Sequence, residues 1–202
     1  MRRLIILFLT FSSLTICATA SATTCTPTAE MTQGPYYVAG ENLRRNIIDK
    51  QPGIRTSLTF TIVDSSCKPV RNAQVDVWHA NAAGVYSGVN GNSANFLRGS
   101  QISNSQGKVT FATIFPGWYP GRVMHIHVKV WRDGKEVLAS QLFAKDALVA
   151  KIYGKGVYAQ RGNQDTTSAE DGIFRSLRNA NAQLMTLKIG ATIVANARLV
   201  LP

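Results

Sequence analysis

Two histidines stand one residue apart in the stretch "FPGWYPGRVMHIH", which runs from Phe115 to His127, and they are two of the chain's three histidines. If residues 125–131 form a strand, side chains alternate between its faces, so His125 and His127 share one face. Two imidazoles with this spacing can bind one metal ion. The alternative is a pair of histidines on a solvated sheet face, because this spacing alone is a weak signal.

Tyr119 lies six residues before His125, in "GWYPGR", whose glycines and prolines predict a turn. A core tyrosine is expected inside an alternating run, not at such a turn. Free tyrosine has a pKa of about 10, so a strongly Lewis-acidic ion is needed to hold the phenolate at neutral pH. Two phenolates and one hydroxide would neutralise the charge of a trivalent ion, so a second tyrosine ligand is expected. Tyr86, in "GVYSG", is the candidate, although by itself it could be a surface aromatic at a strand-to-loop corner.

These motifs occur together in one known family. The chain resembles the intradiol ring-cleavage dioxygenases, the family of protocatechuate 3,4-dioxygenase and catechol 1,2-dioxygenase, and it looks most like their small secreted members. The combination of GxY, PGxYPxR and HxH is far more specific than any one of the three. The matching segments follow the family's order and are "GPYY" (34–37), "PVRNAQVDVWHANAAGVYS" (69–87), "FLRGSQISNSQGKVTFATIFPGWYPGRVMHIHVKV" (96–130) and "SQLFAKD" (140–146).

The resemblance implies a non-haem Fe(III) site with four protein ligands, which are Tyr86, Tyr119, His125 and His127. In that family the tyrosine at the position of Tyr119 is an axial ligand that leaves the metal when substrate binds. Tyr86 and His127 match the equatorial ligands, and His125 matches the remaining axial one.

The resemblance also implies the residues that surround the substrate. Arg122 matches the arginine that lies against the bound catecholate, where it would stabilise developing negative charge. Gln141 matches a glutamine of the family's pocket, which implies a part in catalysis and in substrate binding. Tyr36 and Tyr37 match a segment of the pocket wall, so we expect them to contact substrate rather than metal.

The implied reaction is Fe(III)-dependent intradiol cleavage of a small catecholic substrate by O2. The catechol would bind as a dianion, and Tyr119 would take one of its protons as a general base. Cleavage between the two hydroxyl-bearing carbons, with both atoms of O2 incorporated, gives a cis,cis-muconate-type product. The motifs do not specify which catechol is cleaved, nor do they specify an oligomeric state.

Three other interpretations fit parts of the pattern. His79 could join the other histidines in a copper or zinc site, but the family pattern has a polar residue there that is not a ligand. Zinc or copper could also bind the same four ligands. A non-catalytic, prealbumin-like secreted binding module would share the strand-turn-strand pattern and the PGxY turn. Such a module has no reason to combine Arg122, HxH and Tyr86.

Most of the chain alternates apolar and polar residues over short runs separated by turns, which predicts strands. One segment, 168–183, has a helical pattern opened by Ser168, with Asp171 as a loose capping box. Residues 87–107 are rich in Gly, Asn and Ser and predict a long, functional loop. The expected fold is an all-β antiparallel β-sandwich with long loops and at most one or two short helices. The predicted strands are 56–63, 73–78, 108–115, 125–131, 137–143, 184–189 and 192–201.

The N-terminus predicts export. Residues 1–22 have two arginines, a short apolar run and small residues at the end, as in a secretory signal peptide. We expect residues 23–202 to form a single secreted or periplasmic domain, and no later segment is apolar enough to span a membrane. Cys25 and Cys67 are then the remaining cysteines, and an oxidising compartment favours a disulfide between them. Metal ligation by these thiols is the weaker alternative, because neither lies in a CxxC motif.

The formal net charge is +11, of which the two arginines of the signal peptide contribute two units. A basic exported protein can attract anionic surfaces or acidic small molecules. The Lys and Arg residues are scattered rather than interleaved with aromatic residues in one run, so we expect no nucleic-acid partner.

Overall fold

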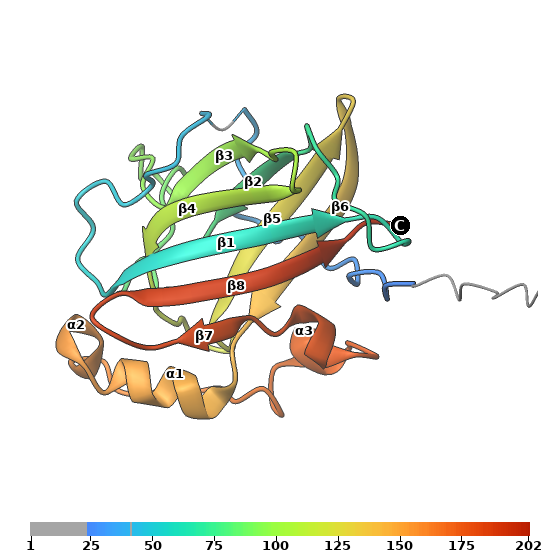
Figure 1. Cartoon of the computed structure of the whole chain (residues 1–202). Helices are drawn as coiled ribbons and strands as arrows, with labels where there is room; N and C mark the ends of the chain where they lie inside the picture. The colour runs from blue at the N-terminus through green and yellow to red at the C-terminus, as the bar shows by residue number, and fades with distance from the viewer. Residues whose placement is uncertain (1–23, 41) are drawn as a thin grey trace, which may run out of the picture.

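Alternation between buried and half-exposed side chains defines β1 (Arg55–Val63), in which Leu58, Phe60 and Ile62 are fully buried. The computed structural model describes residues 24–40 and 42–202, and the predicted signal peptide lies outside the described residues. Two four-stranded sheets pack face to face around one apolar core (Figure 1), which confirms the predicted β-sandwich.

The sheet that contains β1 has the order β4-β1-β8-β7, with β4 (Lys108–Ile114), β7 (Thr186–Lys188) and β8 (Ile193–Val200). Its pairing departs from the expected antiparallel pattern, because β1 and β8 are parallel over Thr56–Val63 and Ile193–Val200. Parallel neighbours need a long connection rather than a hairpin. Here the entire second sheet and the helices lie between the two strands in the sequence.

The second sheet has the order β3-β2-β5-β6 and is antiparallel throughout. Its strands are β2 (Gln74–Trp78), β3 (Arg98–Ile102), β5 (His125–Arg132) and β6 (Lys135–Phe143). Ile126, Val128 and Val130 of β5 lie in the core, so the two histidines occupy the outer face. β3 corrects the sequence interpretation, which predicted a loop throughout 87–107.

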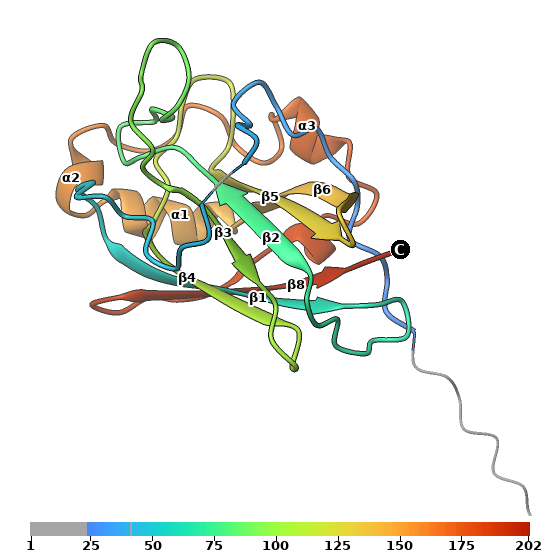
Figure 2. The ribbon, with the colours of Figure 1, turned by 90° about the horizontal axis from the view of Figure 1, so that it is seen from above.

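The helical segments are α1 (Asp146–Tyr153), α2 (Gly156–Ala159), α3 (Gly172–Arg175) and the 3₁₀ turn η1 (Ala180–Gln183). The expectation of one helix at 168–183 is therefore wrong, because that segment contains only α3 and η1. The longest described helix is α1, which buries Val149, Ile152 and Tyr153. Figure 2 shows that several loops gather over the outer face of the β2–β5–β6 sheet, opposite β1 and β8.

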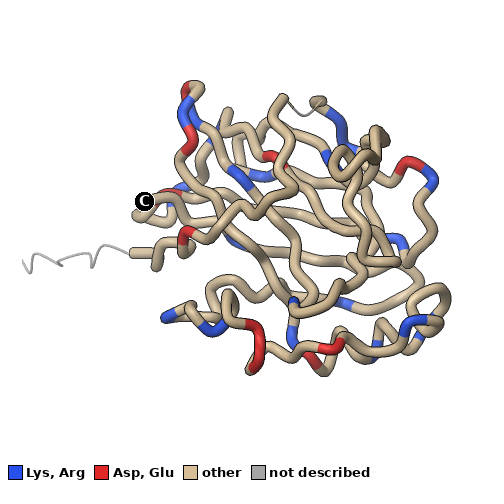
Figure 3. Tube along the Cα trace, turned by 180° about the vertical axis from the view of Figure 1, so that it is seen from behind, with Lys and Arg blue, Asp and Glu red and all other residues tan. Residues whose placement is uncertain are grey.

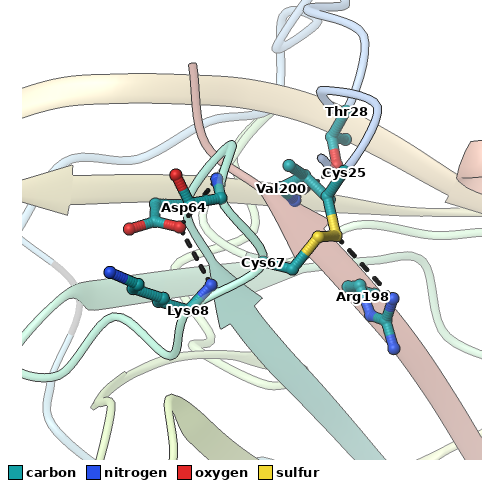
Figure 4. Close-up of a disulfide and its surroundings, with 8 residues drawn as sticks. Cys25, Thr28, Asp64, Cys67, Lys68, Arg198 and Val200 are labelled. Atoms are coloured by element: carbon teal, nitrogen blue, oxygen red, sulfur yellow. Dashed lines mark hydrogen bonds between the residues drawn. A yellow bond between two sulfur atoms is a disulfide. The ribbon is translucent and has the colours of Figure 1, made fainter. Parts of the chain in front are cut away.

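The predicted disulfide is confirmed, since Cys25 is bonded to Cys67 with 5.3 Å between their Cα atoms. It fixes the start of the described chain to the turn after β1 (Figure 4). No helix among the described residues has the length and apolarity that a membrane crossing requires. Lys and Arg positions are spread along the chain and interspersed with Asp and Glu (Figure 3).

Candidate metal centre

His125 and His127 lie on the outer face of the second sheet, yet both are buried, with exposed fractions of 3% and 1%. Strand alternation places them on this face, and their burial means that other parts of the chain cover them. The interpretation of two histidines on a solvated sheet face does not apply to this arrangement.

The hydrogen bonds of His125 define which of its nitrogens carries the proton. Nδ1 lies 2.7 Å from the Val123 carbonyl oxygen, which can only accept, so Nδ1 donates and Nε2 keeps its lone pair. The Tyr119 and Tyr86 hydroxyl oxygens lie 3.0 Å and 3.4 Å from that Nε2. Burial lowers the pKa of His125 to about 3, with the Arg122 guanidinium adding to the effect, so the imidazole is neutral. A neutral imidazole oriented by a backbone carbonyl is the usual state of a metal ligand.

His127 completes the group of imidazoles and phenols. Its ring centroid lies 4.8 Å from that of His125, and its ring stacks on Trp78 at 4.9 Å. Burial, followed by the neighbouring His125, holds the pKa of His127 well below its usual value. Among the described residues, nothing hydrogen-bonds its buried Nδ1.

The loops that carry the two tyrosines pack backbone against backbone. Gly117, two residues before Tyr119, donates its N–H to the Asn81 carbonyl at 3.0 Å. Gly84, two residues before Tyr86, has a φ of +81°, and a Cβ added there would lie 2.1 Å from the Trp118 carbonyl oxygen. Glycine is therefore required at position 84 for the two tyrosines to approach one imidazole.

Both phenols need a cation nearby before they can ionise at neutral pH. Burial, followed by the neighbouring Tyr119, raises the pKa of Tyr86 well above 10, and Arg122 and Arg98 only partly oppose this. Burial also raises the pKa of Tyr119, against the opposing effect of Arg122. A trivalent ion would supply the missing positive charge, and hard anionic oxygen with imidazole nitrogen is a donor set that iron accepts.

Other donor groups do not offer an equivalent set. Within residues 24–40 and 42–202, no three or more His, Cys, Asp or Glu side chains are placed to hold a metal ion. His79 already has partners on both ring nitrogens, the Ala80 carbonyl at 2.8 Å and the Thr113 hydroxyl at 2.7 Å. The residues present thus fit an iron site at the two tyrosines and the two β5 histidines.

Arg122 is held between two side chains beside this cluster. Its Nε donates to Asp171 Oδ2 at 2.8 Å and its Nη2 to Gln141 Oε1 at 2.6 Å. Gln141 has no exposed surface, and its Nε2 donates to the Thr32 carbonyl at 2.8 Å. Both ends of the Gln141 amide are therefore engaged, and its oxygen contacts Arg122. Its contact with substrate stays a prediction.

Asp171 is a functional candidate that sequence reasoning identified only as a helix cap. One carboxylate oxygen does cap α3, while the other accepts from Arg122 and from the Val123 N–H at 3.0 Å. Burial would raise the pKa of Asp171, but the hydrogen bonds that it accepts, above all from Arg122, hold it below its usual value. The ion pair joins residues 49 positions apart, so no local pattern could have revealed it.

The two neighbouring tyrosines of "GPYY" have different places. The Tyr36 ring stacks on Tyr86 at 4.5 Å and meets Tyr119 edge-on at 6.4 Å. The Tyr37 ring lies against Trp78, and its hydroxyl donates to Asp76 Oδ2 at 3.2 Å. Tyr36 therefore belongs to the cluster, whereas Tyr37 is anchored on the adjacent part of the sheet.

A pocket of about 380 Å³ opens beside the tyrosines, which is large enough for a small aromatic ligand. A larger hollow of about 600 Å³ lies beside the disulfide, and none of the metal-ligand candidates lines it. Three residues of the smaller pocket, Val89, Asn90 and Asn92, come from the segment 87–107, predicted to be a functional loop. The smaller pocket is lined by Tyr36, Gly84, Val85, Tyr86, Val89, Asn90, Asn92, Tyr119 and Pro120.

Comparisons with known proteins agree with this site. The pattern of the family described as "Dioxygenase" matches residues 32–172, which include all the site residues named above. The protocatechuate 3,4-dioxygenase beta chain of Burkholderia cepacia is 37% identical over 113 residues, which cover 48% of each chain. The catechol 1,2-dioxygenase of Acinetobacter baylyi is 32% identical over 136 residues, which cover 54% of this chain and 44% of the relative. The chain thus spans about half the length of the curated relatives that it matches.

Solved structures extend the similarity over most of the fold. An intradiol ring-cleavage dioxygenase from Tetranychus urticae has a TM-score of 0.82 and 30% identity, covering 88% of this chain and 94% of that one. The dioxygenase domain of a dioxygenase carbohydrate-binding protein fusion from Streptomyces sp. SirexAA-E has a TM-score of 0.65 and 26% identity, covering 87% and 97%. The chain belongs to the intradiol ring-cleavage dioxygenase family.

Proposed function

We propose that this protein is an exported, Fe(III)-dependent intradiol dioxygenase that cleaves a catecholic ring with O2. The observation that carries the proposal is the convergence of two phenol oxygens on one imidazole nitrogen. The Tyr119 and Tyr86 hydroxyls lie 3.0 Å and 3.4 Å from His125 Nε2, and the His127 ring lies beside them.

Tyr86, Tyr119, His125 and His127 are the residues that would hold the iron. Bound ferric iron would supply Lewis acidity, which lowers the pKa of phenols and of a catechol and draws electron density from the ring that reacts with O2. Burial keeps both imidazoles neutral and therefore able to act as ligands, and it raises the pKa of both phenols.

The remaining residues bind and orient the substrate and handle its proton. Tyr119 lines the pocket, so its oxygen, which bound iron would hold as a phenolate, would be placed to receive a proton from a catechol hydroxyl. Tyr36 also lines the pocket, where its aromatic side chain can pack against the ring of the substrate. Arg122 is oriented by Asp171 and Gln141, so its guanidinium is preorganised to stabilise the negative charge that develops on the substrate.

Export is part of the proposal. It is supported by the signal-like residues 1–22 and by the bond between Cys25 and Cys67, because disulfides persist mainly in oxidising compartments. A single domain over residues 23–202 and the absence of a nucleic-acid partner remain predictions.

The activity is tested by oxygen uptake with purified, iron-loaded protein on catechol, protocatechuate and hydroxyquinol. We expect at least one ring to be opened between its hydroxyl-bearing carbons, with both oxygen atoms from labelled O2 in the diacid product. Cleavage beside the hydroxyl pair would contradict the proposal, and so would oxygen uptake without label in the product. A non-catalytic binding module would give no oxygen uptake on any member of a broad panel of catechols.

A further inference from the structure

Arg98 connects two segments of the site that are far apart in the sequence. It lies on β3 with an exposed fraction of 1%. Its Nη1 donates to the Tyr36 carbonyl at 2.8 Å, and its Nε donates to both the Ser87 carbonyl and the Ser87 hydroxyl at 2.9 Å. The third guanidinium nitrogen, Nη2, also donates to the Ser87 carbonyl. One side chain thus joins the "GPYY" segment to the residue that follows Tyr86.

The joined segments carry rings that form the candidate site. Tyr36 stacks on Tyr86, and Tyr86 reaches His125 Nε2 with its hydroxyl. Because the guanidinium holds the backbone next to both tyrosines, it determines the separation of the segments as well as their orientation. A planar guanidinium with several donors in a fixed geometry can bridge two carbonyl groups in this way, whereas a lysine ammonium acts as a point donor.

Sheet register places Arg98 in line with the rest of the centre. Arg98 on β3 is paired with Trp78 on β2. Trp78 is also paired with His127 on β5, and His127 in turn with Gln141 on β6. The row runs straight across four strands, with Arg98 at one end and the residue that holds Arg122 at the other. The strands therefore fix the base of Arg98 relative to the His127 ligand candidate.

We propose that Arg98 is a positioning residue, which holds the Tyr36 and Tyr86 segments at the spacing that the metal centre requires. We call its hydrogen bonds to Tyr36 and Ser87 the Arg98 bridge. The inference goes beyond the ligand set and rests on the proposed function, because it assigns Tyr86 to the metal.

The test compares Arg98→Lys with Arg44→Lys. Arg44 is a matched control because its side chain also binds β3 but hydrogen-bonds to neither the Tyr36 nor the Tyr86 segment. It donates to the Arg98 carbonyl at 2.9 Å and forms an ion pair with Asp49 at 2.7 Å. Hydrogen exchange measured by mass spectrometry on the iron-free proteins reports on the bridge itself. We expect Arg98→Lys to speed exchange in residues 34–37 and 84–89 together, and Arg44→Lys to leave both segments as in the wild type.

Iron binding then tests the consequence for the site. Arg98→Lys should bind Fe(III) on the order of 10- to 100-fold more weakly, as for other residues that orient metal ligands, with less tyrosinate absorbance per iron. Arg44→Lys should match the wild type in both. If Arg98→Lys does not fold, Ser87→Ala, which removes one acceptor of the bridge, should give smaller changes in the same direction.

Two results would overturn the inference. One is unchanged exchange in both segments of a folded Arg98→Lys protein. The other is an Arg98→Lys protein that exchanges faster in both segments but keeps wild-type iron affinity and wild-type absorbance per iron. The bridge would then stabilise the fold without positioning the metal centre. Wild-type protein that takes up no iron would instead refute the proposed function, while the exchange comparison would still decide whether the bridge exists.

Discussion

Gly84→Ala should disrupt the centre without touching any proposed ligand. The new Cβ would lie 2.1 Å from the Trp118 carbonyl oxygen, whereas ordinary contact begins at 3.4 Å. The loops that carry Tyr86 and Tyr119 must therefore separate by about 1.3 Å, which is the difference between these distances. Misplacement by about 1 Å can lower catalytic efficiency by about 100-fold, and we expect a loss of that size in kcat/KM together with weaker iron retention.

Gly91→Ala is the matched control for Gly84→Ala. Gly91 has a φ of +78°, close to the +81° of Gly84, but a Cβ there would have no neighbour within 4 Å. Both variants should lose about 1–2 kcal/mol of stability from the left-handed backbone, and only Gly84→Ala should also lose activity and iron. The assays are thermal melting, iron content and oxygen uptake. Equal kcat/KM for the two variants would refute the argument that the close backbone approach positions the tyrosines.

Three further changes test other parts of the structure. Replacing Cys25 and Cys67 by alanine should lower the free energy of unfolding by at most about 4 kcal/mol, because the disulfide closes a loop with a sequence separation of 42. The Tm should then fall by roughly 8–16 °C, and an unchanged Tm would contradict this. Arg122→Ala should keep iron and colour but raise the barrier by about 2–4 kcal/mol, and unchanged kcat/KM would remove Arg122 from the mechanism. Asp171→Asn should lower kcat by a smaller factor and keep the α3 cap, because Asn is also a favoured N-cap; a loss as large as that of Arg122→Ala would show that the charge of Asp171 matters beyond positioning.

Local sequence patterns predicted the sheets and most of the candidate ligands. Alternation in β5 placed His125 and His127 on one face, and the glycines and prolines around Tyr119 indicated its turn. The α1 helix was missed, although Val149, Ile152 and Tyr153 have helical spacing and are buried. β3 was missed because its short sequence "RGSQI" lies among Gly, Asn and Ser residues typical of loops.

The supporting residues could not be predicted from local patterns, because each acts on a segment far away in the sequence. Asp171 reaches Arg122 across 49 positions, and Arg98 reaches the Tyr36 carbonyl across 62. Gln141 illustrates the same limit, since the family pattern indicated its vicinity but not that Arg122 and Thr32 occupy both ends of its amide. Only the pairing of strands and the packing of loops bring these groups together.

Visible absorbance together with iron content, measured on the wild type, Tyr86→Phe and Tyr119→Phe, tests the proposed metal centre most directly. We expect red-brown wild-type protein with a tyrosinate band, since both hydroxyls lie at the same imidazole nitrogen. Tyr86→Phe should lose iron or hold it weakly, with reduced colour even when a catechol is present. Tyr119→Phe should keep iron and still develop a band when catechol is added. A colourless wild-type protein after loading with Fe(III), or a Tyr86→Phe variant with full iron and full activity, would rule out this set of iron ligands.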